Sequence, residues 1–406
     1  MTLQLVMFDD ARAQAWHPLT LTRPAGELLF GAHTQRERAE LVFGGRCVGH
    51  VAGAQLRGFA EHDAAPCIDP SEVGTAVARL YLLSRAVPGW QQPAAWPSRT
   101  SGLVMNGEPV GWYVPAGERA PEPSALLDAG AGGSDVLTLN GMVLQHVWEL
   151  IARNPAQVTA DAAAARSRGV STGAVPGHTQ LIGSADDVLL GADVTIEPGV
   201  VIDVAHGPVW LDDGVDVRAF TRLAGPSYIG RGSTVLGGPI AEVSVGPVCK
   251  VHGEIEASIV LGYANKAHDG FLGHAYLGRW VNLGALTTNS DLKNNYGTIR
   301  LWTPEGDVDT GEIKIGCLLG DHVKTGIGTM LNTGTVVGAG SNLYGAAMPP
   351  KYVPPFSWGS GSDLTGYALD RFLQTAATVM ARRGVELEPG MRDVLVRAHE
   401  RGRKDL

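Results

Sequence analysis

A six-residue spacing of aliphatic side chains runs through the second half of the chain and restricts its possible folds more than any other feature. The runs are Val188, Val194 and Val200; Val209 and Val215; Ile229 and Val235; Val245 and Val251; Leu277 and Leu283; and Leu331, Val337 and Leu343. Glycine often lies beside these residues. A hexapeptide repeat of this length is typical of a parallel β-helix, in which aliphatic side chains point inward and small residues turn the corners.

A different pattern precedes the repeat. The apolar runs 3–8, 47–52 and 102–107 predict strands, the spacing in 71–87 predicts a helix, and 135–154 predicts a strand or turn leading into a helix. Small and polar residues at 161–169 and 173–177 predict a linker. The chain therefore divides into an α/β domain over 1–172 and a β-helix over 178–358.

Two later stretches interrupt or end the repeat. Residues 300–312 do not follow the repeat and predict an insertion that leaves the coil as a loop. The proline-rich 349–359 predicts a stop or crossing segment. Helical spacing returns at 364–384, and 388–403 predicts a second, basic helix. We expect this tail, residues 359–406, to pack on a neighbouring domain.

Composition narrows the functional classes. Glycine contributes 54 of 406 residues, about twice its usual share, which fits many tight turns between short strands. The net charge of −9, without a long basic run, argues against nucleic acid as a partner. No apolar run approaches ~18 residues, and Asp9 and Asp10 interrupt the first one, so neither a membrane span nor a signal peptide is expected. Four scattered cysteines fit reduced thiols in a cytoplasmic protein.

Polar residues follow the expected strands of the first domain. Asp9 and Asp10 end the first apolar run, Arg23 comes shortly after, and Asn106 and Asn140 each precede a glycine at the end of a later run. Ligands of open α/β sheets gather at the carboxyl ends of strands. Asp9 or Asp10 could therefore ligate a metal, Arg23 a phosphate, and the asparagines a base or sugar. Spacing alone favours a solvated strand end and a structural Arg–carboxylate pair.

The segment 259–300 carries a dense polar set within the repeat. The motifs KAHDGFLG (266–273), NLGA (282–285) and NNYG (294–297) occur here in order. They resemble the acetyltransferase half of the bifunctional N-acetylglucosamine-1-phosphate uridylyltransferase/glucosamine-1-phosphate N-acetyltransferase, a left-handed parallel β-helix that forms trimers. The resemblance implies His268 as catalytic base and Lys266, Asn282, Asn295 and Tyr296 as substrate-binding residues. Phe271 stands where that family has a substrate-binding tyrosine.

The whole chain is more similar to an alternative, sugar nucleotidyltransferase branch of that enzyme. The resemblance rests on FDD (8–10), PLTLTRPAGELLFG (18–31), GYANKAHDGFLG (262–273), SDLKNNYG (290–297), GDHVKTGIGTMLNTGTVVG (320–338) and PPKYVPPFSWG (349–359). It implies a nucleotidyltransferase-like first domain. The glycine-rich nucleotide loop of the ordinary enzyme is missing, so the resemblance does not by itself imply uridylyl transfer.

The resemblance implies an amino-sugar-phosphate acetyltransferase that uses acetyl-CoA and forms a homotrimer. A histidine, with an ordinary pKa of about 6.5, suits removal of the amine proton, and Lys266 and Lys293 suit the sugar phosphate. The first domain would then couple the product to a nucleotide from UTP with Mg²⁺, for nucleotide sugars of the cell envelope.

Three alternatives remain at this point. The chain could transfer only nucleotidyl groups, with the β-helix as an oligomerisation scaffold. It could be a non-catalytic trimer that senses a ligand or serves as structure. His252, His268 and His274 could also form a zinc site, which requires three convergent ligands.

Overall fold

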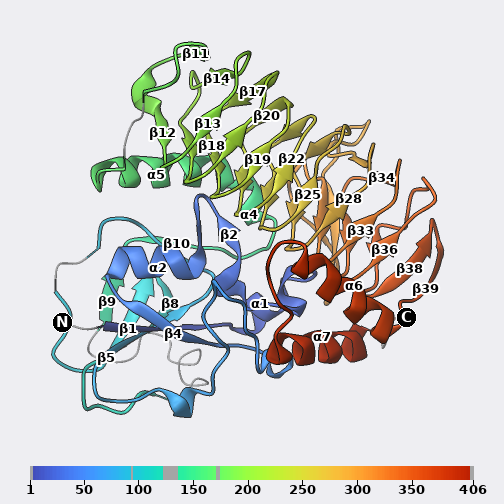
Figure 1. Ribbon diagram of the computed structural model, residues 1–406. Coiled ribbons are helices and arrows are strands. Elements are labelled where there is room, and N and C mark those ends of the chain that lie inside the picture. The colour runs from blue at the N-terminus through green and yellow to red at the C-terminus, as the bar shows by residue number, and fades with distance from the viewer. Residues whose placement is uncertain (1–2, 93–94, 122–135, 171–173, 403–406) are drawn as a thin grey trace.

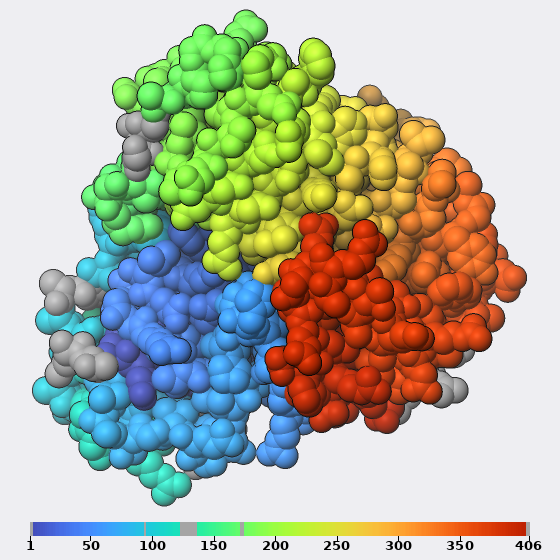
Figure 2. Space-filling view, in the orientation of Figure 1, coloured from blue at the N-terminus to red at the C-terminus, as the bar shows by residue number. Residues whose placement is uncertain are grey.

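A computed structural model describes residues 3–92, 95–121, 136–170 and 174–402. A long stack of short strands lies beside a smaller α/β domain, and two C-terminal helices contact both (Figure 1). Figure 2 shows the tail filling the angle between the first domain and the stack. No helix in these ranges is long and apolar enough to cross a membrane.

The first domain is built on a six-stranded sheet in the order β4-β1-β5-β8-β7-β9. Its strands are β1 (Leu3–Phe8), β4 (Arg46–Val51), β5 (Ala78–Leu83), β7 (Ser101–Met105), β8 (Glu108–Val114) and β9 (Val136–Leu139). The strands run parallel except β8, which is antiparallel to β5 and β7. Strands β1, β5, β7 and β9 therefore end at one edge. The predicted strands at 3–8, 47–52 and 102–107 are confirmed.

The predicted helix over 71–87 is wrong. This stretch forms the central strand β5 and the short β6 (Ala86–Pro88), which pairs with β10 (Gly141–Val143). All six residues of β5 are buried, because β1 and β8 flank it and both faces of the sheet are covered. A strand buried on both faces has no alternating pattern, so its apolar run can have the same spacing as a helix.

The longer helices of the first domain in the described ranges include α2 (Gln35–Phe43) and α5 (Asn154–Ser167), and the short α4 (Glu149–Ala152) precedes α5. The loop predicted at 161–169 is wrong, because α5 continues to Ser167. Its alanines favour a helix, and Asp161 is buried in an ion pair with Arg38. Residues 171–173, within the predicted linker, lie outside the described residues.

The β-helix has three parallel faces. The first face contains β11 (Gln180–Ile182), β14 (Val201–Asp203), β17 (Thr221–Ala224), β20 (Gly238–Ala241), β23 (Ile255–Glu256) and β26 (Leu272–Gly273). The docked face contains β12 (Val188–Leu190), β15 (Val209–Leu211), β18 (Ser227–Ile229), β21 (Ser244–Val245), β24 (Ile259–Val260), β27 (Tyr276–Leu277), β32 (Cys317–Leu319), β35 (Thr335–Val337) and β37 (Tyr352–Val353). The open face contains β13 (Thr195–Ile196), β16 (Asp216–Val217), β19 (Thr234–Val235), β22 (Lys250–Val251), β25 (Asn265–Lys266), β28 (Asn282–Leu283), β33 (Lys324–Thr325), β36 (Asn342–Leu343), β38 (Ser357–Ser360) and the antiparallel β39 (Asp363–Gly366).

The repeat explains this stack. Aliphatic residues at six-residue spacing form one continuous buried core inside the coils, each worth about 1.5–3 kcal/mol when fully buried. The corners approach one another closely. At Gly246, for example, an added Cβ would lie 2.1 Å from the carbonyl oxygen of Leu261, so only glycine fits there. The predicted parallel β-helix is confirmed.

The docked face is apolar on its outer side as well. Ile259, Tyr276 and Leu318 alternate with the inward aliphatics and are buried with Trp16 and Trp148 of the first domain in one cluster. The first domain thus covers this face, and the contact places the two predicted units side by side (Figure 1).

The stop predicted at 349–359 is wrong. Strands β37 and β38 within it continue the docked and open faces, and Val353 is fully buried in the coil core. Pro354 and Pro355 occupy the corner between the strands, where no ladder hydrogen bond is lost. The insertion predicted at 300–312 is confirmed as the hairpin β30 (Arg300–Thr303) and β31 (Gly306–Asp309).

The tail forms α6 (Leu369–Ala381) and α7 (Pro389–Gly402). Their buried residues join Leu56 and Phe59 of the first domain and Ala339 and Phe356 of the β-helix in one cluster. The expected packing of the tail on neighbouring domains is therefore confirmed, and the tail acts as a third contact between them.

Candidate functional site

The outer side of the open face presents a row of polar side chains. Its register aligns Lys250 with Asn265, Asn265 with Asn282, and Asn282 with Lys324. Asn265 Nδ2 donates a hydrogen bond of 2.9 Å to Asn282 Oδ1. The predicted binding residue Asn282 is therefore on an accessible surface, with amide and amine groups stacked above and below it.

Lys266 points the other way, into the coil. Its side chain is 2% exposed, and its Nζ donates to the backbone carbonyls of His252, at 2.8 Å, and of His268. Burial lowers the pKa of the Lys266 amine to about 8, and the charge of Asp269 only partly offsets this shift. In this position Lys266 fixes the backbone of the corner that carries His268.

His268 lies on the corner between the open face and the first face, with an exposed side chain. Among the described residues, none forms a hydrogen bond with its ring. The adjacent Asp269 instead pairs with His252, whose Nε2 lies 3.0 Å from Asp269 Oδ1. Asp269 is thus not the orienting partner of His268, as expected from their adjacent positions in an extended segment.

The other predicted substrate-binding residues of the β-helix are on the insertion, which is longer than the predicted 300–312 and covers 290–316, between β29 (Thr288–Asn289) and β32. Lys293 Nζ donates to the carbonyl of Thr298, and Asn295 Oδ1 accepts from the Gly297 amide at 3.1 Å. Tyr296 is 70% exposed. Strand β29 stacks on β26, so the insertion starts at the end of the first face that is farther from His268. In the described part of one copy, no hydrogen bond or ion pair joins Lys293, Asn295 or Tyr296 to His268.

His274, one of the three histidines of the alternative zinc site, lies beside the start of this insertion. His274 Nδ1 lies 2.8 Å from Asp291 Oδ2, and both side chains are largely buried. Burial opposes ionisation of Asp291, but the His274 hydrogen bond and charge outweigh it and lower the pKa of that carboxyl. No group of three or more metal-ligating side chains occurs in the described ranges, and His252 and His274 each pair with an aspartate instead.

In the first domain, the two aspartates follow β1 as predicted, but each is engaged by the protein. Asp10 Oδ1 caps α1 (Ala11–Gln14) by accepting from Ala13 N, and its Oδ2 accepts from Arg85 Nε, both at 2.8 Å. Asp9 Oδ2 accepts from Ala25 N, and burial raises the pKa of Asp9. Asp9 Oδ1 is buried without a hydrogen-bond partner, but Asp9 does not line the cavity described below, and both oxygens of Asp10 are occupied. In the described part of the chain these carboxylates therefore do not fit a metal centre.

The two predicted asparagines are at the same sheet edge. Asn106 Nδ2 donates to the carbonyl of Gly141 at 3.1 Å, and Asn140 Nδ2 donates to that of Gln91 at 2.9 Å. Both side chains are exposed, and neither lines the cavity described below. Their observed contacts connect loops to one another.

Arg23 is 1% exposed and lies between the domains. Its guanidinium group donates to Asp321 of the β-helix at 2.9 Å and to Glu61 at 3.0 Å. Two carboxylates therefore bind the guanidinium group that was expected to contact a phosphate. The observed geometry is the alternative expectation, a structural Arg–carboxylate pair.

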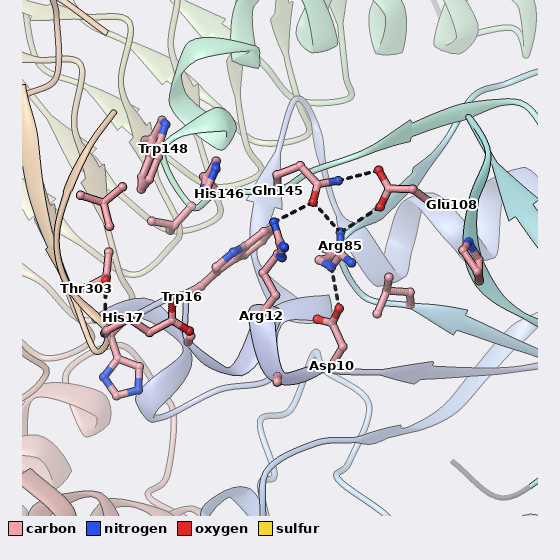
Figure 3. A pocket seen from close by; sticks show the side chains of 17 residues that line it. Asp10, Arg12, Trp16, His17, Arg85, Glu108, Gln145, His146, Trp148 and Thr303 are labelled. Carbon is pink, nitrogen blue, oxygen red and sulfur yellow. Dashed lines mark hydrogen bonds and ion pairs between the residues drawn. The ribbon is translucent and has the colours of Figure 1, made fainter. Parts of the chain in front are cut away.

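A cavity of about 590 Å³ opens at the carboxyl edge of the sheet (Figure 3). One end is charged and contains Asp10, Arg12, Arg85 and Glu108; the other contains the rings of Trp16, His146 and Trp148. Sequence reasoning found only Asp10 among these residues. The available signals were an arginine and a tryptophan at 12–16, shortly after the first predicted strand, and a histidine and a tryptophan at 145–148.

Arg12 has a different environment from Arg85. Arg12 Nη1 donates to Gln145 Oε1, an uncharged acceptor, at 2.8 Å. Arg85 lies between the carboxylates of Asp10, at 2.8 Å, and Glu108, at 3.8 Å. The cavity therefore offers one guanidinium group whose observed partner is neutral and one that already has anionic partners.

Comparison with known proteins matches residues 5–169 to the family model described as sugar nucleotidyl transferase. The first domain is a sugar nucleotidyltransferase domain. Among curated relatives, a bifunctional GlmU protein of Mycobacterium sp. strain KMS is 28% identical over 222 residues, which cover 48% of this chain and 40% of that protein. The GlmU protein of Sphingopyxis alaskensis is 37% identical over 114 residues, covering 26% and 24%.

A bifunctional sugar-1-phosphate nucleotidylyltransferase/acetyltransferase of Sulfurisphaera tokodaii is 25% identical over 95 residues, covering 23% of this chain and 24% of that protein. The chain thus spans between 24% and 40% of the length of these relatives. A solved UDP-N-acetylglucosamine acyltransferase from Arabidopsis matches with a TM-score of 0.26 and 12% identity, covering 52% of this chain and 80% of the other.

The nucleotidyltransferase domain therefore contains the cavity at the edge where open α/β sheets bind ligands. The docked β-helix closes one side of this cavity, because Thr303, Glu305 and Val308 line it. The α/β domain and the β-helix of this transferase-like chain therefore line one cavity together. The corner at His268 is a separate surface on the β-helix.

Proposed function

We propose that the β-helix transfers an acetyl group from acetyl-CoA to the amine of an amino sugar phosphate of the glucosamine-1-phosphate type. The observation that carries this proposal is the corner at His268. Its imidazole is exposed, its backbone carbonyl is bound by the buried Lys266 amine, and the adjacent open face presents Asn265 and Asn282. The Sulfurisphaera relative, which is named as a bifunctional nucleotidylyltransferase/acetyltransferase, is consistent with this chemistry.

In this reaction the substrate amine is neutral, and His268 accepts one proton from it as it attacks. The amine nitrogen attacks the thioester carbonyl, a C–N bond forms, and the C–S bond breaks. The CoA sulfur leaves as a thiolate that takes up the proton from His268, so charge and atoms balance. Backbone amides at the coil corners are suitable donors for the oxyanion that develops on the carbonyl.

The proposal includes a homotrimer, because apolar side chains are exposed along the His268 corner. Phe220 is 85% exposed, Leu286 58% and Ile327 71%, and all three follow strands of the open face, as His268 does. Exposed apolar ridges of this kind favour a protein contact. In the trimer the insertion of a neighbouring copy, with Lys293, Asn295 and Tyr296, would supply the sugar-phosphate contacts that one copy lacks.

Nucleotidyl transfer from UTP to the N-acetylated sugar 1-phosphate is the second proposed activity. It is favoured by the cavity at the carboxyl edge of a sugar nucleotidyltransferase domain. Arg12 and Arg85 are suited to bind phosphate oxygens there. The product would be a UDP-N-acetylglucosamine-type nucleotide sugar.

Free thiol is the direct measure of acetyl transfer. Wild-type protein incubated with acetyl-CoA and glucosamine-1-phosphate should release CoA, and His268→Ala should lower the rate by at least 100-fold. His206→Ala removes another exposed coil histidine and is the matched control, with a rate within twofold of wild type. Absence of CoA release, or release unchanged by His268→Ala, refutes the acetyltransferase proposal.

Pyrophosphate release measures the second activity. The protein is incubated with UTP, Mg²⁺ and N-acetylglucosamine-1-phosphate, and Arg12→Gln is compared with wild type. Release that falls at least tenfold in the variant supports nucleotidyl transfer at the cavity. Thiol release without pyrophosphate indicates that the protein is an acetyltransferase only. Release of pyrophosphate without thiol indicates a nucleotidyltransferase in which the β-helix is a scaffold. Release of neither product supports the non-catalytic alternative.

A further inference from the structure

The hairpin formed by β30 and β31 is fixed over the cavity of the nucleotidyltransferase domain. Leu301, near its base, is fully buried in the cluster that contains Trp16 and Trp148. The ring of Trp302 stacks on Tyr352, with centroids 3.6 Å apart and an interplanar angle of 9°. Because both contacts lie in β30, the following turn is held against the cavity, where Thr303 and Glu305 line one side.

The part of the cavity near the hairpin is aromatic. His146 and Trp148 stack with centroids 4.2 Å apart, and Figure 3 shows Trp16 between them and the charged end. Trp16 is 3% exposed, and its Nε1 has no hydrogen-bond partner among the described residues. A buried N–H without an acceptor costs free energy, so an acceptor on a bound ligand would satisfy it.

The two ends of the cavity select different parts of one ligand. Arginine guanidinium groups bind phosphate through charge-assisted hydrogen bonds, whereas the faces of tryptophan and histidine accept flat or weakly polar ring surfaces. The exposed Glu305 carboxylate at the hairpin turn can only accept hydrogen bonds when ionised, so it suits hydroxyl or N–H donors. The matching ligand is a hydroxyl-bearing ring with a phosphate at one end.

We propose that the β-helix hairpin completes this ligand site. The cavity takes a phosphorylated ring, either a sugar 1-phosphate or a nucleotide, with its phosphate at Arg12 and Arg85. The ring lies on the aromatic end, and Glu305 accepts from its donor groups. This inference rests on the proposed nucleotidyltransferase function and adds that the β-helix determines which ring the first domain accepts.

Calorimetric titration without turnover tests the inference. N-acetylglucosamine-1-phosphate and UTP are titrated separately into the full chain, and Glu305→Gln is compared with Glu312→Gln. Glu312 is an exposed carboxylate of the same insertion outside the cavity, so its loss changes the net charge equally. We expect Glu305→Gln to weaken one ligand at least fivefold and the control to stay within twofold. The weakened ligand identifies the ring under the hairpin.

The direction of the change in affinity distinguishes a direct contact of Glu305 with the ligand from a long-range effect of its charge. Both ligands are anions, so a carboxylate that acted only through long-range repulsion would give tighter binding when removed. Unchanged or tighter binding of both ligands by Glu305→Gln therefore overturns the inference. Trp16→Phe, which keeps the ring and removes the orphaned N–H, should weaken the same ligand.

The inference and the proposed function fail in different ways. Wild-type protein that binds neither ligand overturns the inference, whereas the thiol assay at His268 is unaffected by that result. Wild-type protein that binds a ligand in a Glu305-dependent manner but releases no pyrophosphate supports the site and refutes nucleotidyl transfer.

Discussion

Arg279 of the β-helix and Asp63 of the first domain form a bidentate ion pair. Arg279 Nη1 lies 2.8 Å from Asp63 Oδ1, and Nη2 lies 2.6 Å from Oδ2. Arg279 also donates to Glu61, which binds Arg23, and Arg23 binds Asp321. The two domains are thus joined by a largely buried chain of alternating charges, which explains why neither Arg23 nor Arg279 is available to a substrate phosphate.

Removing Arg279 should strongly destabilise the contact between the domains. Arg279→Met keeps an apolar stem but leaves Asp63 and Glu61 without this cation, and breaking a buried pair costs about 3–5 kcal/mol. The free energy of unfolding in urea measures the loss. The matched control is Arg231→Met, since Arg231 lies 3.8 Å from the same Asp63 carboxylate but is 57% exposed. A surface pair contributes about 1 kcal/mol or less, so similar losses in both variants would contradict this assignment.

Acid should destabilise the first domain through Glu27. Burial alone would raise the pKa of Glu27, but the hydrogen bond with His50 and the charges of His50 and Arg36 outweigh it and lower the pKa to about 2. Because this folded-state value lies below the ordinary value of 4.5, the stabilisation is complete above about pH 4.5 and is lost as the pH falls toward 2. The difference corresponds to about 3 kcal/mol.

Urea unfolding between pH 6 and 3 measures this effect. The wild-type free energy should fall with decreasing pH, and Glu27→Gln should be less stable at pH 6 but show a shallower fall. Glu72→Gln, an exposed carboxylate of the same domain, should keep the wild-type slope. A Glu27→Gln slope equal to that of wild type would contradict the role of this carboxyl.

Much of the fold follows from local pattern, and its failures have a common cause. The hexapeptide repeat predicted the β-helix, because each inward-pointing aliphatic side chain packs on an equivalent aliphatic side chain in the next coil. The errors at 71–87 and 349–359 arose where tertiary surroundings override local pattern: β5 is covered on both faces, and Pro354-Pro355 fits a coil corner. The docking of this face could in principle be predicted from the sequence, because Ile259 and Tyr276 are apolar residues at positions that point out of the coil.

The candidate site was less predictable. The motif KAHDGFLG located the corner, but the inward direction of Lys266 depends on the register of β25 with β22, in which Lys266 aligns with the core residue Val251. The cavity unites Arg12 and Trp148, which are 136 residues apart in the chain, with a hairpin from the other domain. No local sequence pattern predicts this arrangement of segments around the cavity, because it depends on how one folded domain docks on another.

A charge at the exposed apolar corner should dissociate the proposed trimer. Ile327→Glu changes a side chain that is 71% exposed, so the fold of one copy should persist while a subunit contact is lost. Light scattering should give the mass of a trimer for wild type and a smaller mass for the variant. Leu41→Glu, at a 46% exposed position on α2, is the control and should remain trimeric. A monomeric wild-type protein, or a trimer unaffected by Ile327→Glu, would contradict the proposed interface.

Lys266 should act on acetyl transfer through the position of His268 and not through substrate contact. Lys266→Met fills the same interior space but leaves the carbonyls of His252 and His268 without the Nζ donor. We expect kcat to fall at least tenfold with KM for the sugar phosphate within threefold, because the corner shifts while the binding row on the open face remains. Lys250→Met removes an exposed amine from that row and should change KM more than kcat. If Lys266 bound the phosphate directly, its loss would raise KM at least tenfold; if it served stability alone, kcat of the folded protein would not change.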